Sequence, residues 1–401
     1  MNTQDKFPLS LLQNSIDVRK EYFCRKTINH PRLEMAKNDI LSLADTSGKR
    51  DIIIVTGPTG VGKTTLAVKI EDQLLERNMI RMQSDKSHLP VIRVDAIPPD
   101  NKEMKFDWKD FYTRLLYAFS EPCISQKQLF EDEIYMEQPI SPYHAMNTPA
   151  ALRRSVENNM KRRGTRTLII DEANHLLMVD PKLMRRQFEV IKSLSQKCNV
   201  TIILIGTYDL LQILEQSAQL VRRGRVVHMA RYNDYIPADK MAFKNALYSF
   251  QRHMPFKIEP DLVTYLDIFY LKSAGCVGIL KEWLDNVVSE GLNRGLDTID
   301  MEFILQHAHS NKSIQTVLEE VFIGESKLKD IDVKELRGML KLHHKNIGKV
   351  TTQVTGVLPA DANGEQESLP KLPPDKKSVQ GQVGKRSPKR DPAGVNFALF
   401  S

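Results

Sequence analysis

One short segment of the chain combines the residue types that a phosphate-binding loop requires. The segment fits the pattern G-x-x-x-x-G-K-[ST] at every fixed position, and its residues are Gly57, Pro58, Thr59, Gly60, Val61, Gly62, Lys63 and Thr64. In such a loop the backbone N–H groups curl around an anion, and the following helix N-terminus adds partial positive charge. Lys63 can then reach the terminal phosphates, and the Thr64 hydroxyl can ligate Mg²⁺. We therefore predict that these residues, together with Thr65, bind a nucleoside triphosphate.

The sequence on both sides supplies the elements that position this loop. Residues 51–55 form a β-branched apolar run that is typical of a buried strand, and residues 65–70 carry apolar side chains at helical spacing. The alternative interpretation is a glycine-rich turn with a lysine by chance. A strand and a helix in the required order favour the phosphate loop.

A second apolar run, residues 167–170, ends in the two acids Asp171 and Glu172. An acid at the carboxyl end of a strand can hold Mg²⁺ through water, which is the role that we expect of Asp171. A second acid beside it can orient and polarise the attacking water, and we assign this role to Glu172. A phosphate kinase needs no such hydrolytic acid, so the pair favours an ATPase. The alternative is an acidic strand end that faces solvent.

A third strand is expected over residues 200–205, and Thr207 follows it. A polar residue at the tip of the strand between the two nucleotide-binding strands can reach the γ-phosphate or its water. Thr207 is our candidate for this sensing role. The alternative is that Thr207 begins the turn into a helix that starts near Asp209.

The order of these motifs resembles that of the AAA+ ATPases over residues 25–300. More narrowly, the chain resembles the TniB/TnsC family of transposon-encoded ATPases that select target DNA. This resemblance rests on four segments: residues 28–33 (INHPRL), 171–176 (DEANHL), 205–208 (IGTY) and the basic stretch 386–392 (RSPKRDP). Replication-initiator and helicase-loader ATPases share much of the same order.

The resemblance implies an α/β fold, in which an AAA+ P-loop parallel sheet has helices on both faces and is followed by a small α-helical lid domain. It implies ATP and Mg²⁺ as cofactors and a homo-oligomer, a ring or helical filament, around duplex DNA. The residues expected to line the pore are Lys102, Lys105, Arg153, Arg154 and Lys161. Contacts from lysine and arginine to phosphates give affinity without sequence preference. The alternative is a solvated basic helix face.

Three arginines, Arg222, Arg223 and Arg225, come just before the strand expected at residues 226–229. The family places there an arginine that reaches the γ-phosphate of a neighbouring subunit and stabilises charge in the transition state. AAA+ lids often carry a second such arginine, but the expected position, residues 273–281, has none. Gly278 would let this helix approach the nucleotide closely. Whether Lys281 replaces the missing arginine is left open.

Composition divides the chain into five parts. We expect an N-terminal extension that packs near the adenine (1–50), the sheet domain (51–232) with an insertion at 121–149, the lid (233–325), a helical extension (326–350) and a disordered C-terminal tail (351–401). The net charge of +7 permits nucleic acid as a partner, and the four cysteines are scattered without paired spacing. No apolar run has the length of a membrane span and no signal peptide is recognisable, so we expect a cytoplasmic protein without a membrane partner.

We therefore expect an AAA+ ATPase that assembles with ATP on duplex DNA and links a target-recognition protein to a transposase. The tail closes with the basic stretch 386–392 and the apolar residues 395–400, a pattern that suits docking to a transposase. A solubilising role or added DNA affinity is the alternative for this tail. A helicase loader or replication initiator is the first alternative for the whole chain, although 326–350 is too short for a helix-turn-helix domain. The second is a nucleotide-gated scaffold with little hydrolysis, which the pair Asp171 and Glu172 opposes.

Overall fold

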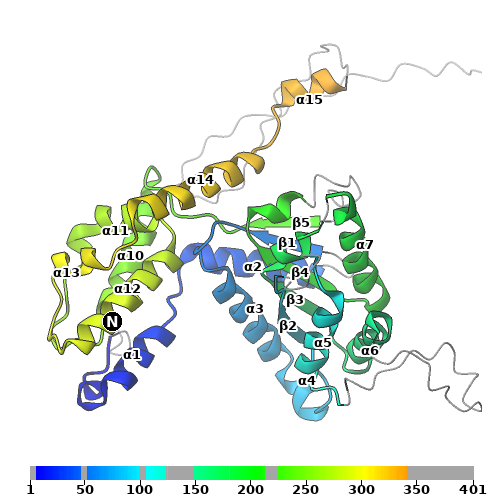
Figure 1. Ribbon diagram of the computed structural model, residues 1–401, viewed down its shortest axis with the longest axis horizontal. Coiled ribbons are helices and arrows are strands. Elements are labelled where there is room, and N and C mark those ends of the chain that lie inside the picture. The colour runs from blue at the N-terminus through cyan, green and yellow to red at the C-terminus, as the bar shows by residue number, and fades with distance from the viewer. Residues whose placement is uncertain are drawn as a thin grey trace, which may run out of the picture. The chain divides into compact units, whose positions relative to one another are not determined.

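The computed structural model describes residues 6–46, 52–98, 105–122, 124, 148–179, 181–212 and 224–340, and these build a parallel sheet and a helical domain (Figure 1). The sheet has five strands in the order β2-β3-β4-β1-β5. Their bounds are β1 Ile52–Thr56, β2 Val91–Asp95, β3 Thr167–Asp171, β4 Thr201–Gly206 and β5 Gly224–His228. Because β1, β3 and β4 run parallel, with β4 between the other two, the phosphate loop, the acid pair and Thr207 all emerge at the same edge of the sheet.

Alternation along β1 divides the sheet core into two layers, since successive side chains of a strand point to opposite faces. Ile52 and Ile54 pack with helices α5 (Trp108–Ala118), α6 (Pro149–Arg162) and α7 (Pro181–Cys198). Ile53 and Val55 pack with α2 (Pro31–Thr46) and α3 (Lys63–Arg77) on the other face. With both faces covered, the strands have to be apolar throughout, which explains the continuous β-branched runs. The expected α/β sheet with helices on both faces is confirmed.

The helical lid has its own apolar core. It is built from α10 (Pro237–His253), η6 (Val263–Tyr265), α11 (Leu266–Ser273), α12 (Val277–Asn293) and α13 (Met301–Gln306). At its centre the rings of Phe269 and Trp283 lie 4.9 Å apart, and the Trp283 indole N–H donates to the Ile304 carbonyl at 3.0 Å. The small α-helical lid that the resemblance implied is therefore present.

The N-terminal extension contributes to both bodies. Helix α1 (Ile16–Arg25) places Phe23 in the lid core, whereas α2 places Leu33 and Ile40 under the sheet. Helix α14 (Asn311–Lys327), which follows the lid, contacts the lid through Ile314 and the sheet domain through Gly324, which lies against Tyr208. It is therefore a bridge between the two bodies rather than only the last helix of the lid.

The remaining described elements are short: η1 (Leu9–Gln13), α4 (Met79–Ser84), η4 (Ala173–Leu177), η5 (Tyr208–Leu210) and α15 (Val333–Met339). Residues 332–401 form a separate unit, of which α15 is the described helix. The predicted insertion, apart from residues 121, 122, 124, 148 and 149, and the predicted disordered tail lie outside the described residues. Within the described ranges no single helix has the length and hydropathy of a membrane span; one pair, Val263–Ser273 with Val277–Asn293, passes that test together but is bent by 112°.

Candidate nucleotide site

The phosphate loop joins the carboxyl end of β1 to α3. Gly62 precedes the helix with a φ of 105°, a left-handed conformation that glycine adopts without strain. Lys63 is the first residue of α3 and is 7% exposed. Its amine donates hydrogen bonds to the carbonyl oxygens of Gly57 at 3.0 Å and Pro58 at 2.8 Å. The lysine amine therefore lies within the cradle of the loop, where the predicted phosphates would bind.

Among the described residues, three acids act on the charge of Lys63. Burial lowers the pKa of Lys63, and the carboxylates of Glu172, Glu320 and Asp171 oppose that effect in decreasing order. Two of these are the predicted pair at the end of β3. Glu320 belongs to α14, and the sequence analysis did not single it out. A buried amine among several carboxylates suits binding of a highly charged anion with its cation.

The predicted Mg²⁺ ligands lie together. Thr64 donates a side-chain hydrogen bond to Asp171, and the Glu172 amide donates to Asp171 Oδ1 at 2.9 Å. Burial raises the pKa of Asp171, and these two hydrogen bonds lower it. A hydroxyl and a carboxylate oxygen in contact are hard oxygen donors of the type that Mg²⁺ prefers, so the residues fit this ion. When bound, the ion would neutralise phosphate charge.

Glu172 lies at the start of η4 with a φ of 50°, in the left-handed region that non-glycine residues seldom adopt. Strained backbone of this kind is concentrated at functional sites. The side chain is exposed, unlike that of Asp171. This arrangement leaves Glu172 accessible to a water at the same edge of the sheet, as the predicted role requires.

Thr207 lies at the tip of β4, as the sequence predicted. Its carbonyl accepts a hydrogen bond from the Thr56 hydroxyl at 2.9 Å, which ties this tip to the end of β1. Its own hydroxyl donates to Asp209 Oδ2 at 3.3 Å. Beside it, Asn174 Oδ1 is buried without a hydrogen-bond partner among the described residues. The same Asn174 atom lies 2.7 Å from where a side chain on Gly206 would begin. Asn174 is thus a further polar candidate at this tip.

A cavity of about 350 Å³ adjoins the phosphate loop. Its walls come from the segment after α1, from the loop and from α12, and they include Thr27, Ile28, His30, Leu33, Val61, Gly62, Thr65, Val277, Gly278 and Lys281. The volume lies within the range of about 300–1,000 Å³ typical of small-molecule sites. Burial lowers the pKa of His30 to about 4, and its Nδ1 lies 2.9 Å from the Tyr232 hydroxyl. Residues 28–33, one of the segments on which the TniB/TnsC resemblance rests, therefore form one wall of a pocket suited to a base and sugar.

The lid meets the phosphate loop backbone to backbone. The Ile279 amide donates to the Gly60 carbonyl at 3.1 Å, and a side chain on Gly278 would begin 2.3 Å from that same oxygen. Gly278 permits a close approach, as predicted, but the backbone that it approaches is that of the phosphate loop. Lys281, the suggested replacement for the missing lid arginine, is paired with Asp285 of its own helix and contacts the N-terminal segment. Its amine donates to the Cys24 carbonyl at 3.3 Å and lies 4.7 Å from the centre of the Phe23 ring.

Arg231 is a cation near this site that the sequence analysis missed. It lies in the segment that joins β5 to the lid, in which the Met229 amide bonds to Thr56 and the Tyr232 amide to Gly275. Its Nε is 3.5 Å from Glu325 Oε1, and its guanidinium lies 5.8 Å from the centre of the Phe322 ring. No motif or spacing distinguished Arg231 from the other arginines, because its partners belong to α11 and α14.

The predicted DNA-contacting residues differ in their exposure and in their contacts. Lys102 lies outside the described residues, and Lys105 is exposed. On α6, Arg154 and Lys161 are both exposed and lie two helical turns apart, on one face. Arg153 points elsewhere, since it donates to Glu157 at 2.8 Å and to Ser193 at 2.9 Å.

Of the three arginines proposed to act on a neighbour, Arg222 and Arg223 lie outside the described residues. Arg225 is the second residue of β5, so it lies within the strand and not before it, because Gly224 already pairs with Ile52. It is exposed at the amino end of the sheet, opposite the phosphate loop.

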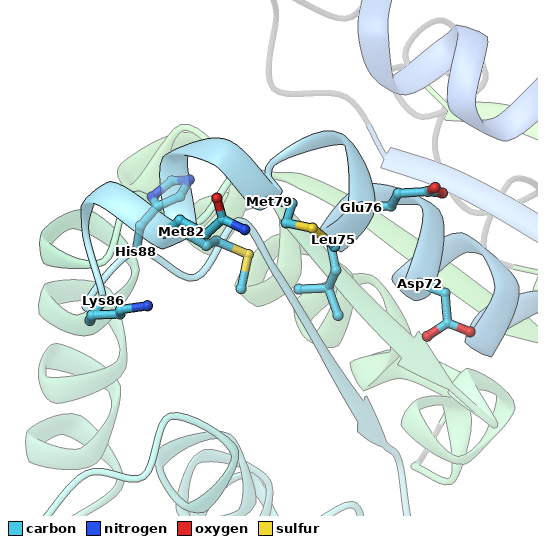
Figure 2. Close-up of a pocket in the computed structure, with 8 residues that line it drawn as sticks. Asp72, Leu75, Glu76, Met79, Met82, Lys86 and His88 are labelled. Atoms are coloured by element: carbon cyan, nitrogen blue, oxygen red, sulfur yellow. The ribbon is translucent and has the colours of Figure 1, made fainter.

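A second hollow, of about 440 Å³, lies at the far end of α3 and along α4 (Figure 2). Leu75, Met79 and Met82 supply an apolar floor, with Asp72 at one end and Lys86 at the other. The helix α3 begins at the phosphate loop and has 15 residues, so this hollow is about 20 Å from Lys63. None of the residues predicted to bind nucleotide or DNA lines it.

Comparison with known proteins gives one family match and several similar solved structures. Residues 46–214 match a family model described as an AAA domain. The chain is similar to the ORC2 protein of Aeropyrum pernix in its ADPNP–ADP complexes (TM-score 0.46, 12% identity, 72% of each chain covered). It is also similar to a Walker-type ATPase of Pyrococcus abyssi (0.43, 14%, 76% of this chain and 75% of that one) and to the RuvB branch migration motor of Thermotoga maritima (0.37, 16%, 71% and 72%). No curated protein matches the chain.

The family match and the strand order together show that the chain contains an AAA-type P-loop ATPase domain with the AAA+ fold. The broad resemblance is confirmed, whereas the narrower resemblance to TniB/TnsC stays a prediction. Asn174, Arg231 and Glu320 are among the polar residues near the site that the sequence analysis did not assign.

The contact between the lid and the phosphate loop can be tested by substitution of Gly278. Gly278→Ala should separate Ile279 from Gly60, because its new side chain would begin 2.3 Å from the Gly60 carbonyl oxygen. We expect a loss of about 1–3 kcal/mol in the free energy of unfolding, as for overpacked sites, together with weaker nucleotide binding. Thermal unfolding followed by tryptophan fluorescence measures the first effect. Gly338→Ala in α15, where the added carbon meets nothing within 4 Å, is the control. Equal unfolding midpoints for the two variants would contradict the packing argument.

Proposed function

We propose that this protein is a Mg²⁺-dependent ATPase that assembles with ATP on duplex DNA and acts as a switch in DNA transposition. The observation that carries the enzymatic part is the juxtaposition of Lys63, Thr64, Asp171 and Glu172 at one edge of the sheet. Lys63 would hold the terminal phosphates, and Thr64 and Asp171 would hold Mg²⁺. Glu172 would orient the attacking water, while Thr207 would contact that water or the γ-phosphate.

Assembly would complete the site. Arg225 is exposed at the edge of the sheet opposite its own phosphate loop, so it serves no phosphate bound there. An arginine in that place can act on a nucleotide held by a neighbouring subunit, which couples hydrolysis to oligomerisation. Arg222 and Arg223 are the other candidates for this role.

Duplex DNA is the proposed polyanionic partner. Arg154 and Lys161 share an exposed face of α6 and can contact phosphates, and Arg153 is paired with Glu157. Contacts of this kind give affinity for any sequence, which suits a protein that relies on a separate target-recognition partner. The net charge of +7 agrees with such a partner.

A helicase-loader or replication-initiator role is the alternative for the same fold. The TniB/TnsC resemblance of segments 28–33 and 171–176 favours transposition, and both segments border the described nucleotide site. A nucleotide-gated scaffold is disfavoured by the accessible Glu172.

Binding and hydrolysis should separate by residue. Lys63→Ala should abolish ATP binding, because the phosphates lose their cationic contact. Glu172→Gln should retain binding but slow phosphate release by about a hundredfold or more, since the water loses its base. Phosphate release and equilibrium binding measure the two effects, both with Mg²⁺ and with EDTA. Glu189→Gln, an equivalent change at an exposed position of α7, is the control. Hydrolysis at the wild-type rate by Glu172→Gln would show that the water-orienting role is wrong.

DNA binding should require ATP and fall steeply with salt. The double variant Arg154→Ala/Lys161→Ala should weaken binding to all duplex sequences alike and reduce the slope of log affinity against log salt by about 2. Its nucleotide affinity should be unchanged. Lys244→Ala/Lys257→Ala, which removes two exposed lysines of the lid, is the control. A preserved slope, or a strong sequence preference of the protein alone, would exclude α6 as the DNA-contacting element.

The C-terminal tail is proposed to dock a transposase. Deletion of residues 380–401 should leave ATP hydrolysis and assembly on DNA intact. It should abolish capture, in a pull-down, of the purified transposase encoded by the same transposon. The reason is that this segment combines basic residues with apolar anchors. An internal deletion of residues 360–379 shortens the same tail and is the control. Normal capture by the 380–401 deletion would assign docking to another surface.

A further inference from the structure

Helix α14 is held at both ends around the nucleotide site. Near its start, Ile314 packs with Cys276 and Ile279, which belong to the turn of the lid that contacts Gly60. Near its end, Gly324 lies against Tyr208, the residue after Thr207. A side chain on Gly324 would begin 2.1 Å from two atoms of the Tyr208 ring, so only glycine fits there.

The anchor near Gly324 is itself fixed. The Tyr208 hydroxyl lies 2.9 Å from His228 Nε2 at the end of β5, and Glu325 pairs with Arg231 at 3.5 Å. Helix α14 thereby connects the first turn of α12 with the tips of β4 and β5. Helix α14 therefore lies at the phosphate end of the site, near Lys63, and away from the pocket suited to the base.

The face of α14 that points toward this site carries Glu320. It precedes Gly324 by one helical turn, so the two residues share a face of the helix. Glu320 Oε1 is buried and has no hydrogen-bond partner within the described part of the chain. It lies between the two anchors of α14, Ile314, which packs with the Ile279 that bonds to Gly60, and Gly324, which packs on Tyr208. The Glu320 carboxylate is also one of the charges that raise the pKa of Lys63. A buried carboxylate oxygen without a donor is costly, and one placed beside the predicted phosphate site calls for a functional explanation.

We propose that Glu320 is a specificity-determining residue of the nucleotide site, which weakens binding of a triphosphate more than binding of a diphosphate. The inference rests on the proposed ATP-binding function and deepens it. A γ-phosphate brings additional negative charge to the amine of Lys63, and a carboxylate that faces the same amine repels that charge. A diphosphate ends farther from Glu320 and is repelled less. Glu320 would therefore favour the ADP-bound protein and make the ATP-bound protein depend on assembly.

The test compares the affinities for two nucleotides. Glu320→Gln keeps the shape of the side chain and removes its charge. We expect its affinity for the non-hydrolysable analogue ADPNP to rise about tenfold, and its affinity for ADP to rise less than about threefold, relative to wild type. Equilibrium competition against a fluorescent ADP on the full chain, with Mg²⁺ and at fixed salt, measures both. Glu319→Gln, the same change at an adjacent exposed position, should leave both affinities unchanged.

A second variant separates charge from structure. Glu320→Asp keeps the charge on a shorter side chain and should retain most of the wild-type ratio of the two affinities. An equal shift of that ratio in Glu320→Gln and Glu320→Asp would show that the residue acts through packing, and it would overturn the proposal. If the wild type binds ADP and Glu320→Gln has an unchanged ratio of the two affinities, the proposal is also overturned. That result would leave the proposed ATPase function intact. A wild-type protein that binds neither nucleotide would overturn both.

Discussion

The contact between the phosphate loop and the first turn of α12 is the constraint on which the rest of this structure depends. Ile279 donates its amide proton to Gly60, and Gly278 allows the two backbones to meet. Without side chains at Gly60 and Gly278, the lid approaches a loop whose N–H groups have to stay directed at an anion. The cavity beside Val61 and Thr65 exists because the lid closes over one side of that loop.

This contact also determines where charge gathers. A lysine held within the loop by its own carbonyls needs acids nearby, because burial disfavours its charged form. Asp171 and Glu172 come from β3, a strand of the same sheet, and their position follows from parallel pairing. Glu320 comes from a helix beyond the lid. The phosphate end of the site is thus built from both bodies, and a change in the lid contact changes the charge around Lys63.

The lid lacks an arginine at the start of α12, but Arg231 lies in the segment that joins β5 to the lid. The start of α12 carries no arginine, and Lys281 is engaged with the N-terminal segment. Arg231 lies instead in the segment between β5 and the lid, where it is paired with Glu325. This ion pair joins the connecting segment to α14, and the neighbouring Gly324 packs on Tyr208, which contacts His228 at the end of β5. These contacts tie the position of the helix after the lid to the tips of β4 and β5.

The sequence by itself determined the features that depend on neighbouring residues. The phosphate loop, Asp171 with Glu172, and Thr207 were predictable because strand, turn and helix signals occur within short windows. The parallel sheet followed from the order of these strands. The tertiary structure decided what depends on residues far apart: His30 meets Tyr232 across 202 positions, and Glu320 reaches Lys63 from a helix beyond the lid. No local pattern distinguishes such a histidine or glutamate from others, since its role is set by how two separately folded bodies pack. Helical periodicity places Arg154 and Lys161 on one face of α6 and Arg153 beside Glu157, but only packing showed that Arg153 also bonds to Ser193 on α7.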